Sequence, residues 1–139
     1  MNFNHLSIKQ GDNLPEFAIT PSYMQLFMYS AITWNRHHVH YSKDAAIEEG
    51  LPDVVVHRGL LGNFLASMFE SWLGDNGELQ NLNWKVLSSA TPKLELTCQA
   101  KATNVVSEED AIIVSCDLEI NQQDKRISVG DATVKLFLD

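Results

Sequence analysis

The 139 residues suffice for one hydrophobic core but not for two, so we expect a single domain over residues 1–139. Hydrophobic residues make up 45% of the chain and charged residues 20%, which is ordinary for a globular protein. The formal net charge of −8 argues against a nucleic-acid partner and against binding to anionic membrane surfaces.

The sequence shows no sign of export or of a membrane span. Its first 17 residues have neither the basic start nor the apolar core of a signal peptide, and no apolar run is long enough to cross a bilayer. Cys98 and Cys116 lie in alternating apolar runs at no metal-binding spacing, as expected for buried thiols in a reducing compartment. We therefore expect a cytoplasmic protein.

Two helices are predicted in the first part of the chain, after a short extended run at 17–20. Pro21 and Ser22 are typical of a helix start, and Ser42 and Gly50 are typical of the two ends of a second, short helix. The first helix has a stripe of large apolar residues at helical spacing: Met24, Phe27 and Met28. We interpret this stripe as core or dimer contact; an acyl-chain pocket is the alternative, and the stripe could serve both purposes.

Residues 59–73 predict a long helix that is buried on most of its sides. Apolar residues cover nearly its whole circumference, and the polar residues are few: Asn63, Ser67, Glu70 and Ser71. A run of three valines at 54–56 leads into this helix.

The second half of the chain alternates between apolar and polar residues, which is typical of half-buried antiparallel strands. The alternation is strict over residues 94–102 and is repeated over 112–120, and a less regular strand is predicted over 79–89. After a turn at 121–125, the apolar positions change from odd to even numbers. That change predicts a β-bulge at Gly130–Asp131 in the last strand.

One buried helix and about four long antiparallel strands predict an α+β hot-dog fold, in which the sheet wraps around the helix at residues 59–73. Such a sheet leaves an edge strand unpaired. We therefore expect edge-to-edge pairing, either in a homodimer or in a hetero-oligomer with another hot-dog subunit.

The segment TWNRHHVHYSKDAA, residues 33–46, gathers four side chains that can exchange protons or form hydrogen bonds: Asn35, His37, His38 and His40. A metal site, acid–base catalysis and simple exposed polarity are the three interpretations. No carboxylate or cysteine falls at a recognised ligand spacing from these histidines or from His57, so we expect no metal site and no cofactor.

The order T-x-N-x-H-x-V-H-Y-x-x-D-x-A, followed by G-L-P-D-V-V-V-H and a long apolar helix, resembles the MaoC-like dehydratases and (R)-specific enoyl-CoA hydratases. The resemblance extends over roughly residues 25–138 and is specific over 33–61. It implies a hot-dog lyase that hydrates 2-enoyl thioesters, or dehydrates 3-hydroxyacyl thioesters, in fatty acid metabolism. The substrate would be an acyl-CoA or acyl-carrier-protein thioester.

The resemblance also implies site residues. The family motif D-x-N-P-[IL]-H supplies an aspartate and a histidine that hold the attacking water; His40 takes the place of the histidine and Asn35 that of the aspartate. An amide can position a water but cannot usefully exchange a proton, so His40 would be the acid/base. The backbone amides of Arg58 and Gly59, at the expected helix start, would bind the thioester oxygen. Arg58 replaces the usual family glycine.

Two further histidines are candidates for substrate binding. His57 ends the valine run, and a hydrogen-bonded structural role at the strand–helix junction is its alternative. His37 and His38 are adjacent, so we expect one of them to support the site and the other to be solvated. We assign His37 to the site.

Two other functions stay open. A hot-dog thioesterase would need an acidic residue or an activated water at the thioester carbonyl, but the carboxylates of the 33–61 segment are interpreted as surface groups: Asp44, Glu48, Glu49 and Asp53. A non-catalytic or half-site subunit of a heteromeric hydratase would explain both departures from the family motif, at Asn35 and at Arg58.

Overall fold

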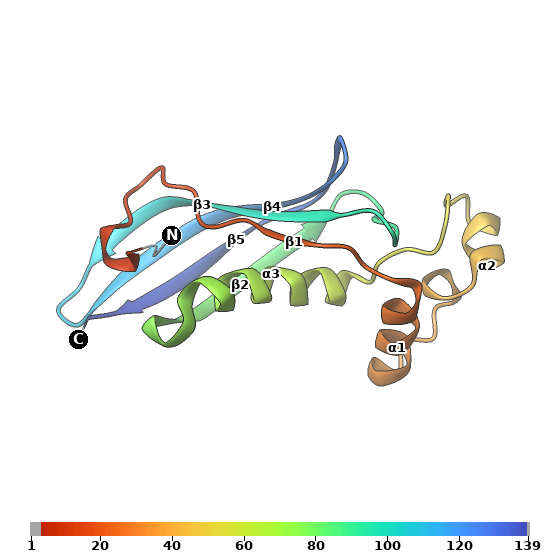
Figure 1. The fold of residues 1–139 in the computed structure, drawn as a ribbon, viewed down its shortest axis with the longest axis horizontal. Helices are drawn as coiled ribbons and strands as arrows, with labels where there is room; N and C mark the ends of the chain where they lie inside the picture. Colours follow the sequence, from red (N-terminus) through yellow and green to blue (C-terminus); the bar gives the residue numbers. More distant parts are fainter. Residues whose placement is uncertain (1–3, 139) are drawn as a thin grey trace.

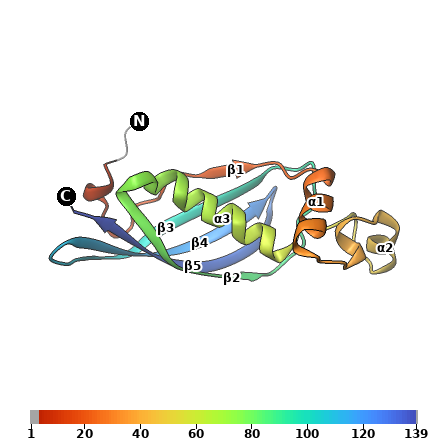
Figure 2. The same cartoon turned by 90° about the horizontal axis from the view of Figure 1, so that it is seen from below.

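A computed structural model of the chain describes residues 4–138. Five antiparallel strands form one sheet that curls around a long helix (Figures 1 and 2). The order across the sheet is β1-β3-β4-β5-β2, so that β1 and β2 are its edges. The strands are β1 (Phe17–Ile19), β2 (Gly77–Val86), β3 (Leu96–Ser107), β4 (Ala111–Gln122) and β5 (Lys125–Phe137).

Three α-helices accompany the sheet. They are α1 (Tyr23–Thr33), α2 (Lys43–Glu48) and α3 (Arg58–Leu73), with single 3₁₀ turns η1 (His5–Ser7), η2 (His38–His40) and η3 (Gly74–Asn76). The N-caps predicted for the two short helices are confirmed, because the Ser22 and Ser42 side chains accept hydrogen bonds from Gln25 N and Ala45 N. Helices α1 and α2 lie together beyond one end of the sheet, next to the start of α3 (Figure 1).

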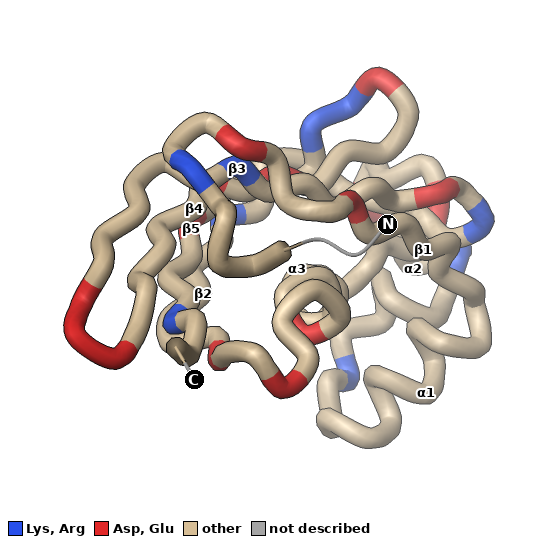
Figure 3. Tube along the Cα trace, turned by 60° about the vertical axis from the view of Figure 1, so that its left-hand side comes forward, with Lys and Arg blue, Asp and Glu red and all other residues tan. Residues whose placement is uncertain are grey.

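Helix α3 is the centre of the core, as its all-round apolar sequence predicts. The strands curve around it (Figure 3). Its buried residues are Leu60, Leu61, Gly62, Phe64, Leu65, Met68, Phe69, Trp72 and Leu73. Full burial of one such large apolar side chain stabilises the fold by roughly 1.5–3 kcal/mol. No helix within residues 4–138 is long and apolar enough to cross a membrane.

Both cysteines lie on the inner face of the sheet. Cys98 on β3 and Cys116 on β4 are buried and unpaired, as the alternating pattern predicts. Burial raises the pKa of each thiol to about 12, with a smaller contribution from Glu16 at Cys98 and from Asp117 at Cys116. The two thiols are therefore protonated in the folded protein.

Strand β5 contains a bulge, but the predicted position at Gly130–Asp131 is wrong. The pairing of β4 with β5 is continuous there and shifts register at Ile127, which is the extra residue of β5. Ile127 and Ser128 are both buried, and this produces the change of parity seen in the sequence. Gly130 instead allows β5 and β2 to approach closely, because a Cβ at this position would lie 2.0 Å from the carbonyl oxygen of Asn83 on β2.

The apolar stripe of α1 is not part of the core of this chain. Met24, Phe27 and Met28 are 65%, 56% and 51% exposed, so the core alternative of the sequence interpretation is wrong. Helix α1 instead buries the opposite face, through Leu26 and Ser30. The two residues are one helical turn apart, and Ser30 contacts His57, the residue before α3, so the stripe faces outward.

Candidate active site

His40 ends the 3₁₀ turn η2 and is held there by the loop that leads into α3. Val39 is buried beside this loop, and its carbonyl accepts a hydrogen bond from Val55 N at 3.0 Å. The Nδ1 atom of His40 lies 2.7 Å from the carbonyl oxygen of Val55. Because a carbonyl only accepts, this bond assigns the proton of the neutral ring to Nδ1 and leaves the lone pair on Nε2.

The surroundings of His40 favour its neutral form. Half-burial lowers its pKa below the ordinary 6.5, and the nearby His37 lowers it further, while the hydrogen bond to Val55 acts in the opposite direction. A neutral imidazole with a free Nε2 lone pair is a competent general base at neutral pH.

His57 packs directly against His40. The two rings are stacked, with centroids 3.8 Å apart and planes inclined by 18°. His57 is 1% exposed, and its Nε2 lies 2.6 Å from the hydroxyl oxygen of Ser30 on α1. Burial, with a smaller effect of His40, lowers the pKa of His57 to about 4. Its Nδ1 atom has no hydrogen-bond partner among the described residues.

The start of α3 presents unpaired donors beside this histidine pair. His57 is the residue before the helix, and the first bond of the helix runs from Leu61 N to the carbonyl oxygen of His57. The amides of Arg58, Gly59 and Leu60 therefore have no acceptor within the helix, and the helix dipole adds partial positive charge at the same place. This is the environment that an oxygen with developing negative charge requires.

The Arg58 side chain is held away from this helix start by Trp84 on β2. Its Nη2 donates to the carbonyl oxygen of Trp84 at 3.1 Å, and the Trp84 indole donates back to the carbonyl oxygen of Arg58 at 3.0 Å. The guanidinium carbon lies 4.5 Å from the centroid of the indole ring. Gly62 makes room for this ring, because a Cβ there would lie 2.3 Å from it.

Asn35 stabilises the turn before His40. Its Oδ1 accepts a hydrogen bond from His37 N at 3.2 Å, and its backbone N donates to the carbonyl oxygen of Ser30. No hydrogen bond joins its side chain to His40 or His57 within residues 4–138.

The two adjacent histidines contact different neighbours, and both are exposed. The His37 ring contacts the His40 ring edge to face at 5.8 Å, and His37 Nε2 lies 3.2 Å from a carboxylate oxygen of Glu49. The exposed His38 contacts the Tyr41 ring instead, at 5.5 Å. In the described part of the chain, no group of three or more potential ligands could hold a metal ion.

Three neighbours of the site are not predicted as such from the sequence: Ser30 and Tyr29, and Glu49, which the sequence suggests only as a surface group. Ser30 and Tyr29 reach His57 from α1, and Glu49 reaches His37 from the end of α2. The helical pattern places Ser30 one turn after the apolar Leu26, but nothing in the sequence relates that face to the valine run.

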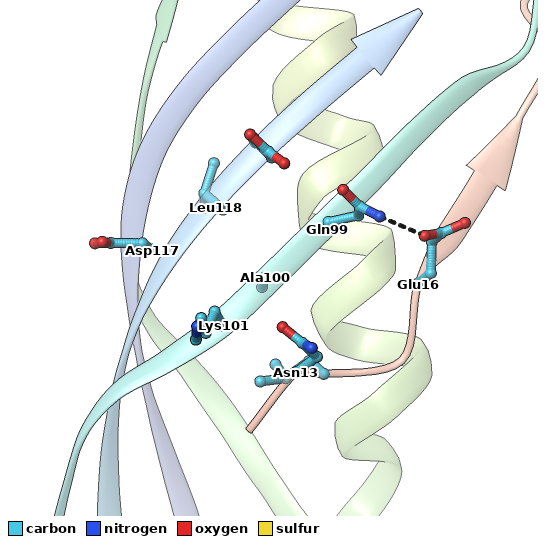
Figure 4. Close-up of a pocket in the computed structure, with 9 residues that line it drawn as sticks. Asn13, Glu16, Gln99, Ala100, Lys101, Asp117 and Leu118 are labelled. Carbon is cyan, nitrogen blue, oxygen red and sulfur yellow. Dashed lines mark hydrogen bonds between the residues drawn. The ribbon is translucent and has the colours of Figure 1, made fainter. Parts of the chain in front are cut away.

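A second group of charged side chains lies on the opposite face of the sheet. A cavity of about 410 Å³ is formed where the segment before β1 runs beside β3, with residues of β4 also in its lining (Figure 4). Glu16 and Gln99 share a hydrogen bond at its rim, and Lys101 and Asp117 line its floor. These strand side chains point away from α3, so this cavity is separate from the His40 environment.

Several solved structures share the fold. The (R)-hydratase from A. caviae involved in PHA biosynthesis has a TM-score of 0.82 at 17% identity, over 94% of this chain and 98% of that chain. A MaoC-like dehydratase from Rhodospirillum rubrum has a TM-score of 0.84 at 12% identity, over 99% of both chains. The ChsH1-ChsH2 complex from Mycobacterium tuberculosis has a TM-score of 0.80 at 13% identity, over 92% and 98%. These likenesses confirm the hot-dog fold predicted from the sequence.

The sequence comparison gives the family. No curated protein sequence matches the chain significantly. The sequence profile of hydroxyacyl-thioester dehydratase type 2 matches residues 4–92, which include α1, the histidine-rich segment, α3 and β2. Most of the chain is covered, and the MaoC-like resemblance of the 33–61 segment agrees with the match. The chain therefore belongs to the hydroxyacyl-thioester dehydratase type 2 family.

Proposed function

We propose that this protein reversibly hydrates 2-enoyl thioesters to 3-hydroxyacyl thioesters, with His40 as the acid/base. The observation that supports this best is the orientation of one ring: His40 Nδ1 is bonded to Val55, which frees Nε2, and the ring is stacked on the residue that precedes α3. A base and a set of unpaired amide donors are thus neighbours, and a hydratase needs both.

The proposed reaction assigns a task to each group. Nε2 of His40 removes a proton from a water, and the water oxygen bonds to C3 of the enoyl thioester. The π electrons move toward the thioester oxygen, which the amides of Arg58 and Gly59 stabilise. His40 then returns the proton to C2. Asn35 positions the water. His57 holds the His40 ring by stacking on it, and His37 lowers the pKa of His40; neither exchanges protons with substrate.

The net charge of the chain favours coenzyme A over an acidic carrier protein as the thioester carrier. A cavity of about 690 Å³ is lined by two lysines, Lys93 and Lys125, and by two carboxylates, Asp53 and Asp124. The two lysines can meet phosphate groups, whereas the net charge of −8 disfavours an acidic carrier protein. We therefore propose an acyl-CoA substrate.

An oligomer is part of the proposal. Strand β2 is ten residues long and lies at the edge of the sheet, which is a surface that natural proteins usually cover. Several large apolar side chains at the α1 end are also exposed: Met24, Phe27, Met28, Ile32 and Trp34. Apolar groups gathered in this way are typical of a protein interface. Light scattering on the purified chain distinguishes a dimer from a monomer.

The test is hydration of crotonyl-CoA, followed by the loss of enoyl absorbance. We expect the His40→Ala variant to lose at least about 10²-fold in kcat, the usual contribution of a general base. The matched control is His38→Ala, which removes an exposed neighbouring ring outside the site and should keep the wild-type rate. Circular dichroism and thermal unfolding check that both variants fold. Near-normal turnover of His40→Ala would end the proposal.

A half-site subunit is the second candidate function. It is favoured by the amide at Asn35, since a carboxylate would have to come from elsewhere to serve as a second proton-transfer group. The ChsH1-ChsH2 complex shows that this fold occurs in a complex of two different proteins. Inactivity of the pure chain, together with a stable complex with a second hot-dog polypeptide, would favour this reading. Release of free CoA without loss of enoyl absorbance would instead identify a thioesterase.

A further inference from the structure

Tyr29 is an aromatic residue of α1 that reaches the start of α3. Figure 2 shows α1 lying next to this end of α3. The Tyr29 side chain is half-buried against the core, and its ring centroid lies 4.6 Å from that of His57, with the planes inclined by 55°. His57 is therefore in contact with two rings, His40 and Tyr29.

The Tyr29 hydroxyl lies against the first turn of α3. A Cβ built on Gly59 would be 2.3 Å from the hydroxyl oxygen and 3.4 Å from Cζ of the same ring. The hydroxyl thus occupies the space that the side chain of any other residue at position 59 would fill. It lies beside the amides of Arg58 and Gly59, which have no acceptor within the helix.

This hydroxyl has no hydrogen-bond partner among residues 4–138. The oxygen is not one of the buried atoms that lack a partner, so it is open to its surroundings and can donate to an acceptor there. The Tyr29 hydroxyl is thus an unpaired donor that lies beside two unpaired amides. This arrangement suits the binding of an acceptor atom of a ligand.

We propose that Tyr29 is a further catalytic residue, whose hydroxyl donates a hydrogen bond to the thioester oxygen alongside the amides of Arg58 and Gly59. The inference rests on the proposed hydratase function. Tyr29 keeps its proton throughout: the water proton goes to His40 and then to C2, and the hydroxyl only stabilises charge on the thioester oxygen. A third donor compensates in part for the carboxylate that Asn35 does not supply.

The first test compares Tyr29→Phe with the wild type in crotonyl-CoA hydration. Loss of one such donor lowers kcat by about 10²-fold in known oxyanion sites, and we expect a loss of about that size. Tyr41→Phe is the matched control: the Tyr41 hydroxyl donates to the carbonyl oxygen of Arg36, away from α3, so its rate should match the wild type. The acid limb of the pH profile should stay in place in both variants, because His40 is retained.

A spectroscopic measurement separates catalysis from packing. Acetoacetyl-CoA is a non-reacting thioester whose enolate absorbs in the ultraviolet, and donors around its thioester oxygen favour the enolate. We expect the wild type to increase the enolate absorbance on binding and Tyr29→Phe to reduce this increase. A purely structural role for Tyr29 would leave the enolate fraction of the bound ligand unchanged.

The contact with Gly59 provides a coupling test. In Gly59→Ala the new methyl group displaces the Tyr29 hydroxyl while the backbone amide remains, so kcat should fall nearly as far as in Tyr29→Phe. In the Tyr29→Phe background the same substitution should cost little more, because the nearest remaining ring atoms lie at 3.4 and 3.8 Å. Equal losses in both backgrounds, or an unchanged rate in Tyr29→Phe, would overturn the role of Tyr29 and leave the hydratase proposal intact. An inactive wild type would overturn both.

Discussion

The ring of His57 lies flat against the ring of His40, with 3.8 Å between their centroids. Two positive charges at that separation would repel strongly, and both environments already disfavour the charged form. The pKa of His57 is the one lowered to about 4, so His40 is the ring that titrates first as the pH falls. In the proposed reaction, the stack thereby keeps the His57 ring neutral as a support and leaves the His40 ring to exchange protons.

The acid limb of the reaction should respond to His37. Charge on the His37 ring lowers the pKa of His40, so the His37→Gln variant should raise it and move the acid limb of kcat/KM to higher pH. His38→Gln, at the adjacent exposed position, should leave the limb unchanged. The measurement is the rate of crotonyl-CoA hydration across the pH range. A shift toward lower pH in His37→Gln would contradict this assignment.

Stability should fall at acid pH because of His57. In the unfolded chain its pKa is about 6.5, and in the folded protein it is about 4. Well above pH 6.5 the His57 ring is neutral in both states. Between pH 6.5 and pH 4 the proton binds mainly to the unfolded state, so acid favours unfolding. The loss should approach about 3 kcal/mol near pH 4. Urea unfolding at several pH values measures it.

The His57→Gln variant is the control for this pH dependence. It removes the titrating ring and keeps a side-chain amide opposite Ser30, so its stability should depend less steeply on pH than that of the wild type. Carboxylates titrate in both proteins, and the difference between the two curves therefore isolates His57. Parallel curves would show that the ring is not buried as described.

Asn35 should contribute to the turn and limit the rate. Asn35→Ala removes the acceptor of His37 N and should lower the free energy of unfolding by about 1 kcal/mol. Asn35→Asp keeps that acceptor and adds a group that can exchange a proton, so its stability should match the wild type and its hydration rate should rise several-fold. Thermal unfolding and initial rates measure the two effects. An unchanged rate in the Asp variant would restrict position 35 to the turn.

Arg58 should matter for stability more than for chemistry. Arg58→Lys keeps the charge but loses the planar group that binds the carbonyl and the ring of Trp84, so we expect a loss of about 1 kcal/mol. The backbone amide is unchanged, and kcat should stay within about threefold. Arg126→Lys is the control, because Arg126 makes an exposed ion pair with Glu119 that contributes little. A large fall in kcat would place the guanidinium in the reaction.

Local patterns predict the scaffold well because they depend on near neighbours in the sequence. The all-round apolar sequence of residues 59–73 predicts the buried α3, and the serine caps predict the starts of α1 and α2. The less regular strand predicted at 79–89 runs from Gly77 to Val86. A change of parity marks a bulge but does not locate it, since Ser128 is polar and yet buried.

The candidate site is less predictable because it is assembled across elements. The segment around His40 and the valine run before α3 are recognisable from the motif, and the structure brings them together through the bond to Val55. The contribution of α1 depends on how that helix is placed beyond the sheet. An apolar stripe normally indicates the packed face, but here α1 packs through Leu26 and Ser30, so Ser30 and Tyr29 are not apparent from periodicity.

The inward position of Cys98 and Cys116 has a practical consequence. A thiol must lose its proton and meet the reagent before it is alkylated, and in the native state burial prevents both. Under native conditions, iodoacetamide therefore alkylates only those molecules whose sheet has opened. The labelling rate of these two side chains, measured by mass spectrometry, therefore reports how often the core opens. The same measurement can be made on each variant.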